Sequence, residues 1–257
     1  MKLKDGISFS FKDELARIGS TPLRSHPSAF FWQKSLSVDN QFCNAVVRAG
    51  YLSWEQMLNA SCRYCIGASK KHGVIFWQID HEGRVHDGKV MYYLPDCHRD
   101  KSKEAHPTWI SALLAKRDPF HNTAHNPSHC FFGLHLLMAD GTRQNASIAI
   151  VEAEKTAFIL SELYPQSVWL ASGGLGEVQP DKFRPLRGCK IVMFPDTDPD
   201  GIAFKRWNEA ANTVMHSPFW EDSPPIRVSH LLETHATPDQ KQRKIDLVDF
   251  LFESHKE

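Results

Sequence analysis

Three aspartates at alternate positions follow an apolar run in the second half of the chain. Residues 192–204 have the sequence VMFPDTDPDGIAF, which brings Asp196, Asp198 and Asp200 close together. Like charges this close repel one another, so we expect a cation to offset them. Carboxylate oxygens on a short loop suit Mg²⁺ or Mn²⁺, which keep several waters that phosphate oxygens can replace. The loop therefore predicts a divalent metal site that receives phosphate.

Two other loop types share part of this pattern and fit it less well. A calcium-binding EF-hand loop also begins Asp-x-Asp-x-Asp-Gly, but its twelfth position should be a glutamate and is Trp207 here. A dehalogenase-type loop places a nucleophilic aspartate at the strand end, whereas Asp198 lies beyond Pro195-Asp196-Thr197. The magnesium or manganese interpretation therefore stands.

The elements around this loop predict a parallel α/β layer. Residues 148–164 have the pattern of a buried strand running into a helix, and residues 167–176 of a second strand with a glycine loop. A third strand is expected over 189–196, a helix over 201–215, a fourth strand over 226–232 and an acidic helix over 244–252. This alternation is typical of a parallel sheet of about four strands. Function in such sheets gathers beyond the strands' carboxyl ends, where Glu152 and Glu154 follow the first strand.

A smaller α+β domain is expected upstream, with domain ranges of 1–145 and 146–257. Residues 38–50 and 53–61 have the pattern of short helices, the second opening with Ser53 and Gln56 in the register of a capping box, and residues 73–94 have the pattern of a β-hairpin. The hairpin mixes aromatic residues with basic ones, including Arg84 and Lys89. Such a surface is able to stack bases and bind phosphates, and the alternative is an ordinary hairpin with one core face and one charged face.

Composition is that of an ordinary globular protein. The chain has 257 residues, of which 42% are apolar, and neither a signal peptide nor a run of membrane-spanning length is evident. We therefore expect a cytoplasmic protein. Residues 1–147 carry 18 Lys and Arg against 13 Asp and Glu, while residues 148–257 carry 12 against 17. A basic front half and an acidic back half suit contacts with a polyanion and a cation, although ordinary solvated surfaces explain the imbalance equally well.

Two stretches together resemble the Toprim domain of primases, topoisomerases and OLD-type nucleases. They are IAIVEAEKTAFIL (148–160) and KIVMFPDTDPDGIAFKRW (190–207). By this resemblance Glu152 matches the family's catalytic glutamate, while Asp196 and Asp198 match its metal-binding pair. Many relatives have a glycine after that glutamate, and this chain departs from the pattern with Ala153.

Further residues extend the resemblance over about 50–252. Asp200 with Gly201 completes a form typical of the primase-like branch, and Asp246 and Asp249 resemble the secondary acidic residues of a later helix. Residues 64–93 and 129–137 resemble an uncharacterised, primase-related group of Toprim-like proteins on bacterial mobile elements. The resemblance implies a metal-dependent phosphoryl or nucleotidyl transfer on nucleic acid, with DNA replication as its setting.

Several residues are candidates to contact phosphate. Lys155 lies one turn into the first helix of the second half, Lys205 lies in the later helix, and Gly173 and Gly174 offer backbone amides. A solvated helix charge is the alternative interpretation of Lys155. Glu152 would act as a metal ligand or as a general acid/base.

Among Toprim activities, primase-like nucleotidyl transfer is favoured. The chain leaves little room for a topoisomerase tyrosine domain and has no G-x-x-x-x-G-K-[ST] loop for an ATPase. Residues 1–60 have no Cys-x-x-Cys pair for a zinc ribbon, so a non-catalytic module that binds nucleic acid or a replication protein is the alternative, and a nuclease is a further one. Expected partners are single-stranded DNA or RNA, nucleotides and a helicase or other replication protein, with no membrane. Structural zinc at Cys62, Cys65, Cys97 and His98 is not expected, because only one true Cys-x-x-Cys pair is present.

Overall fold

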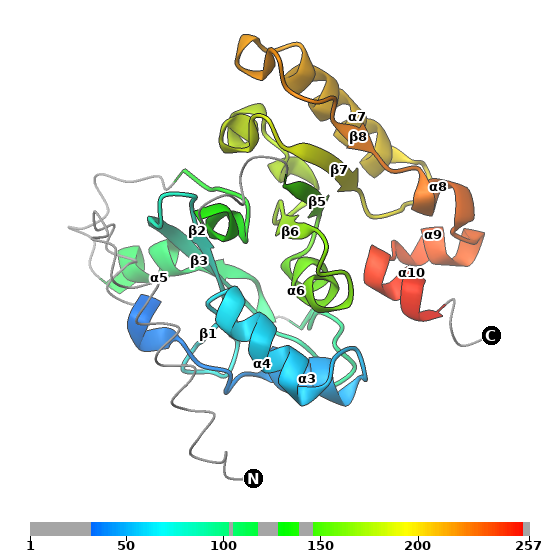
Figure 1. Cartoon of the computed structure of the whole chain (residues 1–257). Helices are drawn as coiled ribbons and strands as arrows, with labels where there is room; N and C mark the ends of the chain where they lie inside the picture. Colours follow the sequence, from blue (N-terminus) through cyan, green and yellow to red (C-terminus); the bar gives the residue numbers. More distant parts are fainter. Residues whose placement is uncertain (1–31, 103–104, 118–127, 139–145, 254–257) are drawn as a thin grey trace. The chain divides into compact units, whose positions relative to one another are not determined.

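The chain forms two compact units, residues 1–129 and 130–257. The computed structural model describes residues 32–102, 105–117, 128–138 and 146–253 (Figure 1), so the expectations for residues 1–31 lie outside the described part. The second unit begins earlier than the sequence boundary at 145/146. Phe131, Leu134 and Leu137 are buried in its core, so this short segment before the first parallel strand packs with the parallel sheet.

The first unit combines short helices with an antiparallel sheet. Both predicted helices begin at capping residues: the Asn40 side chain accepts a hydrogen bond from the Cys43 amide at 2.9 Å, and Ser53 and Gln56 form the predicted capping box. The sheet has the strand order β1-β2-β3-β4. The elements of this unit are α3 (Gln41–Arg48), α4 (Trp54–Arg63), β1 (Gly67–Ala68), β2 (Val74–Ile79), β3 (Val85–Met91), β4 (Thr108–Trp109) and α5 (Ile110–Arg117).

Strands β2 and β3 form the predicted hairpin, but its aromatic residues are not a stacking surface. Phe76, Trp77 and Tyr93 are buried. The Phe42 ring packs 5.3 Å from the ring of Phe76 and 4.8 Å from that of Tyr93, measured between centroids. These buried rings are not available to stack on bases, so the alternative of an ordinary hairpin with a core face applies to them.

Asp80 holds the turn between the two hairpin strands. One of its carboxylate oxygens accepts hydrogen bonds from the amides of Glu82 and Arg84, each at 2.9 Å. The other oxygen accepts from Arg84 Nε at 2.7 Å and lies 2.9 Å from His86 Nε2. Burial opposes ionisation of this carboxyl, but His86 and the donors from Arg84 and Glu82 outweigh it and lower its pKa.

Asp80→Ala is expected to destabilise the protein by about 2 kcal/mol at pH 7, because charge-assisted hydrogen bonds from a buried turn are lost. A depressed folded-state pKa adds stability that is present above the ordinary value of 3.8 and lost as the pH falls. Urea denaturation should therefore show a difference from wild type that shrinks below about pH 4. Asp96→Asn is the control, since that side chain is 66% exposed; an equal loss in both variants would contradict the role of Asp80.

The second unit is built on the predicted parallel sheet. Its strand order is β6-β5-β7-β8, all parallel, so the fold-class prediction is confirmed. The elements are η3 (Leu134–Met138), β5 (Ser147–Val151), α6 (Glu154–Leu163), β6 (Val168–Ala171), η4 (Leu175–Glu177), η5 (Pro180–Leu186), β7 (Lys190–Phe194), α7 (Ile202–Met215), η6 (Pro218–Trp220), β8 (Arg227–Val228), α8 (Leu231–His235), α9 (Pro238–Arg243) and α10 (Leu247–Glu253).

Helix α7 fixes the acidic loop to the sheet. Ala203, Trp207 and Val214 on one of its faces are buried, and Trp207 and Val214 belong to the core that also contains Ile150 of β5 and Met193 of β7. The helix therefore begins at a set place beyond the end of β7. Within the described ranges, no helix is both long and apolar enough to cross a membrane.

Candidate acidic pocket at the strand ends

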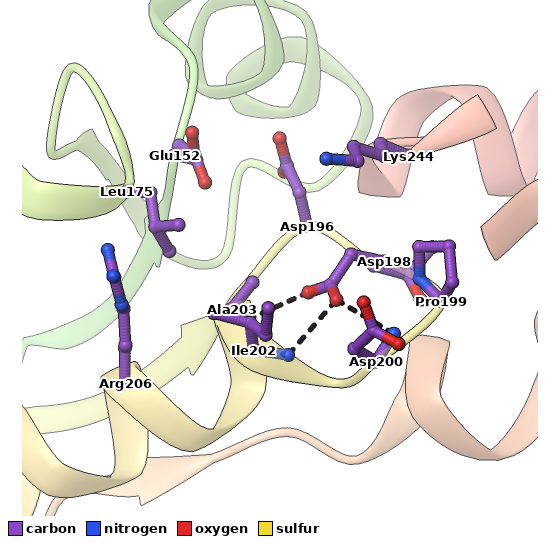
Figure 2. A pocket seen from close by; sticks show the side chains of 11 residues that line it. Glu152, Leu175, Asp196, Asp198, Pro199, Asp200, Ile202, Ala203, Arg206 and Lys244 are labelled. Atoms are coloured by element: carbon purple, nitrogen blue, oxygen red, sulfur yellow. Dashed lines mark hydrogen bonds between the residues drawn. The ribbon is translucent and has the colours of Figure 1, made fainter. Parts of the chain in front are cut away.

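The two acidic segments predicted from the sequence meet at the carboxyl edge of the parallel sheet. Strands β5 and β7 are direct neighbours, with Val151 opposite Phe194, so Glu152 and Asp196 follow adjacent strand ends. Both line a pocket of about 470 Å³ to which Asp198 and Asp200 also contribute. Figure 2 shows these side chains around the pocket. The remaining lining residues are Leu175, Thr197, Pro199, Ile202, Ala203, Arg206 and Lys244.

Asp196 has an unfavourable electrostatic environment in this pocket. Loss of solvation raises its pKa well above the ordinary value of 3.8, and the carboxylates of Glu152 and Asp246 raise it further. Lys155 acts in the opposite direction, and Asp249 adds to the repulsion. The pocket therefore concentrates negative charge that a cation would stabilise.

Asp198 lines the pocket and also accepts hydrogen bonds from the backbone at the start of α7. One of its carboxylate oxygens accepts hydrogen bonds from the amides of Asp200 at 3.0 Å and Ile202 at 3.1 Å, and the other accepts from Ala203 at 2.8 Å (Figure 2). Burial opposes ionisation, but these three amides outweigh it and lower the pKa of Asp198. The carboxylate thus binds the start of α7, where it also complements the helix dipole.

Gly201 makes this arrangement possible. It is the N-cap of α7 and has φ 64°, in the left-handed region that glycine enters without strain. The turn places Asp200, which is exposed, at the rim of the pocket. The three aspartates therefore have different surroundings: Asp196 lies in the wall of the pocket, Asp198 binds the start of α7, and Asp200 lies at the rim.

Lys155 is buried rather than solvated. Its ammonium nitrogen lies 3.0 Å from Asp246 Oδ2 and 3.3 Å from Asp249 Oδ1, and its side chain is 8% exposed. Lys155 and the secondary acidic residues Asp246 and Asp249 thus form one ion cluster between α6 and the start of α10. Neither a solvated helix charge nor a surface phosphate contact describes this lysine.

The glycine loop after β6 supports Glu152 through the backbone. The Gly173 amide donates to the Glu152 carbonyl oxygen at 2.9 Å, and the Ser172 amide donates to Val151 at 3.0 Å. Gly173 has φ 88°, in the left-handed region. The Gly173 amide therefore holds the end of β5 in place, and Gly174 continues the loop to Leu175 at the pocket.

Two cationic residues of the pocket were not predicted from the sequence. Arg206 lies on α7 four residues after Ile202, so both side chains reach the pocket from one helix face. Lys244 ends α9 with φ 57° and lowers the pKa of Asp198. The helical spacing of Ile202 and Arg206 could have predicted that both side chains lie on one face of the helix. The position of Lys244 could not be predicted in this way, because it depends on how the chain packs in three dimensions.

The remaining predicted contact residues lie elsewhere. Lys205 is exposed on α7 and does not line the pocket. Arg84 and Lys89 belong to the first unit, where the guanidinium of Arg84 binds Asp80 and also Glu82, at 2.6 Å. The ion pairs of Arg84 therefore stabilise the hairpin turn.

No preformed metal cage is present among the described residues. Nowhere in ranges 32–102, 105–117, 128–138 and 146–253 do three or more His, Cys, Asp or Glu side chains come together in an arrangement that holds an ion. In the cysteine group considered for zinc, Cys65 and Cys97 are buried and Cys62 is half-buried. For Mg²⁺, one or two carboxylates with waters and substrate phosphates are sufficient, so the donor chemistry of Glu152 and Asp196 fits this ion.

Comparisons with known proteins identify the fold. The structure matches the E. coli primase catalytic core with a TM-score of 0.50 and 16% identity, over 88% of this chain and 80% of that one. The primase fragment of the bacteriophage T7 primase-helicase protein matches with a TM-score of 0.46 and 17% identity, over 75% and 69% of the two chains. The E. coli match shows a primase-like Toprim fold.

Two sequence comparisons complete this result. The profile of a family described as "Domain of unknown function (DUF6371)" matches residues 40–197. No curated protein sequence matches the chain. The matched range includes the hairpin of the first unit and the segments that carry Glu152 and Asp196.

Proposed function

The chain belongs to the DUF6371 family, and we propose that it is a primase-related protein that transfers phosphoryl or nucleotidyl groups on nucleic acid with a divalent metal ion. One observation carries the proposal. Glu152 and Asp196 follow adjacent parallel strands and line the same pocket as Arg206 and Lys244. Metal-assisted phosphoryl transfer requires carboxylates that bind the metal ion and, beside them, basic side chains that bind phosphate.

Glu152 and Asp196 would hold Mg²⁺ or Mn²⁺, with Asp200 at the rim. Bound there, the ion would neutralise charge that develops on the transferring phosphorus. Arg206 and Lys244 would bind the phosphate oxygens of a nucleotide. Because the pKa of Asp196 is raised, this carboxyl holds its proton more strongly than an ordinary aspartate and releases it when a cation binds.

Asp198 enters this proposal as a structural residue. Its three amide partners fix the loop between β7 and α7, and the loop in turn fixes the position of Asp196. Lys205, Arg84 and Lys89 remain candidates for contacts with a nucleic-acid strand outside the pocket. Such contacts would be sensitive to salt, because each neutralised phosphate releases counterions.

The proposal includes the partners expected from the sequence. They are single-stranded DNA or RNA as template, nucleotides as substrates, and a helicase or another replication protein that acts with the chain. A protein with these substrates works in the cytoplasm, and a mobile genetic element is the setting that the sequence resemblance favours.

Synthesis of short oligonucleotides on a single-stranded template is the direct test. The full chain should make product with Mg²⁺ or Mn²⁺ and none in EDTA. Glu152→Gln should lower the affinity for the ion and the product yield by about 10- to 100-fold, because a charged donor is lost. Glu154→Gln is the matched control: it lies two residues away, is buried and does not line the pocket.

The outcomes separate the alternatives. Unchanged synthesis in Glu152→Gln would contradict the proposal. Cleavage of labelled strands without nucleotides, abolished by the same substitution, would favour a nuclease. Strand binding that resists EDTA, with neither synthesis nor cleavage, would favour the non-catalytic module.

A further inference from the structure

Lys155 is enclosed by acidic groups at the edge of the pocket. It lies in the first turn of α6, and its partners Asp246 and Asp249 lie at the start of α10, the helix that contacts α6 (Figure 1). The side chains of the three residues are 8%, 8% and 15% exposed. A lysine in such surroundings keeps its charge only when carboxylates compensate for the lost water.

Both oxygens of Asp246 accept hydrogen bonds from donors of the protein. Oδ2 accepts from Lys155 Nζ at 3.0 Å and from Thr156 Oγ1 at 2.7 Å. Oδ1 accepts from the Asp249 amide at 2.9 Å. A metal ion at Asp246 would have to displace these donors, one of which carries a full positive charge.

This ion cluster belongs to the same electrostatic region as the pocket. Asp196 is influenced by Lys155, Asp246 and Asp249 as well as by Glu152. The acidic region therefore has two parts. In the first, Glu152 and Asp196 face the pocket, and in the second, Asp246 and Asp249 hold an ammonium.

We propose that Lys155 is the built-in cation of this second part and takes the place of a second divalent ion, so that the pocket binds a single Mg²⁺ or Mn²⁺ at Glu152 and Asp196. The inference rests on the proposed function for the existence of that first ion. It assigns Lys155 a positioning role: the lysine holds α10 against α6 and balances the charge behind Asp196 without entering the reaction.

The number of bound ions tests this assignment. Mn²⁺ titration of the full chain, followed by calorimetry and by the electron paramagnetic resonance of free Mn²⁺, should give one ion for wild type and for Lys155→Arg. Lys155→Met should bind two, because the vacated carboxylates become ligands. Lys182→Met is the matched control and should bind one: Lys182 is also 8% exposed and pairs with Glu177 at 2.7 Å, but unlike Lys155 it is not among the charged groups that act on Asp196.

If Lys155→Met does not fold, a double variant with neutral side chains at both positions replaces it in the test. Lys155→Gln combined with Asp246→Asn keeps hydrogen-bonding groups at both positions and should still bind one ion, with affinity within about threefold of wild type. Loss of that ion would make Asp246 a ligand and overturn the inference. Two ions in wild type, or one in a folded Lys155→Met, would also overturn it and leave the proposed function standing. No ion in wild type would overturn the proposed function itself and this inference with it.

Discussion

Asp196→Asn is expected to reduce metal-dependent synthesis by on the order of 10³-fold, since a metal ligand contributes several kcal/mol to the transition state. The same substitution should raise the free energy of unfolding of the metal-free protein at pH 7. It removes a carboxylate that is repelled by Glu152, Asp246 and Asp249 and poorly solvated. A gain in stability together with a loss of activity is typical of a strained functional residue.

The pH dependence of stability follows from the direction of the pKa shift. The pKa of Asp196 is raised in the folded protein above the ordinary 3.8. The stabilising contribution of its proton is fully present below 3.8 and is lost as the pH rises through the raised folded-state pKa. In EDTA, the stability advantage of Asp196→Asn over wild type should therefore grow over this window, and Mg²⁺ should reduce it at pH 7 by stabilising wild type alone.

Urea denaturation of both proteins across the pH range, with EDTA or Mg²⁺, measures these effects. Asp181→Asn is the control, because its side chain is 84% exposed and its ion pair with Arg184 should contribute little. A less stable Asp196→Asn in EDTA would contradict the repulsion described for the pocket. Synthesis at the wild-type rate would contradict the role of Asp196 in metal binding.

Local and periodic signals explain what the sequence predicted well. The capping box at Ser53 and Gln56 depends on residues three positions apart, and it is present as expected. The alternation of strands and helices set the parallel sheet, and the adjacency of β5 and β7 then brought Glu152 and Asp196 together. Convergence at the strand ends follows from topology, which a pattern of elements can specify without side-chain detail.

The features that sequence analysis missed depend on tertiary packing. The sequence around Lys155 is that of an ordinary helix. Its partners Asp246 and Asp249 come from a distant part of the chain, at the start of α10, and only the folded structure brings them to the lysine. Lys244 reaches the pocket for the same reason. The mixture of aromatic and basic residues in the hairpin fits either interpretation, and only the packing of Phe42 from α3 against Phe76 shows that this ring belongs to the core.

The acidic loop illustrates the limit most clearly. The three alternate residues are all aspartates, but the conformation of the backbone gives their side chains different surroundings. The left-handed turn at Gly201 brings the amides of Ile202 and Ala203 to Asp198, while Asp196 stays at the strand end beside Glu152. A repeated residue type therefore predicted that these aspartates gather at one strand end, but not that their side chains would have different hydrogen-bond partners.

Substitutions at Asp198 distinguish a helix-stabilising carboxylate from a metal ligand. Asp198→Ala should lower the free energy of unfolding by about 2 kcal/mol, since three amides at the start of α7 lose their acceptor. Asp198→Asn keeps one acceptor oxygen, which can serve the amides of Asp200 and Ile202, but its NH2 group cannot accept from the Ala203 amide. It should therefore cost about 1 kcal/mol, less than Asp198→Ala, from one lost acceptor and the lost charge at the helix N-terminus. Urea denaturation in EDTA measures both values.

Activity provides the second half of this test. If Asp198 stabilises the start of α7 and does not bind the metal, Asp198→Asn should keep synthesis and Mn²⁺ affinity within about tenfold of wild type. For Asp198→Ala, the Mn²⁺ affinity of the folded protein should fall in proportion to its lower free energy of unfolding. A metal ligand would behave otherwise: Asp198→Asn would then lose synthesis as severely as Asp196→Asn while remaining nearly as stable as wild type. Because the two substitutions remove the same charge two residues apart in one pocket, a different response reflects the surroundings of each carboxylate, which are three backbone amides for Asp198 and the repelling carboxylates of Glu152 and Asp246 for Asp196.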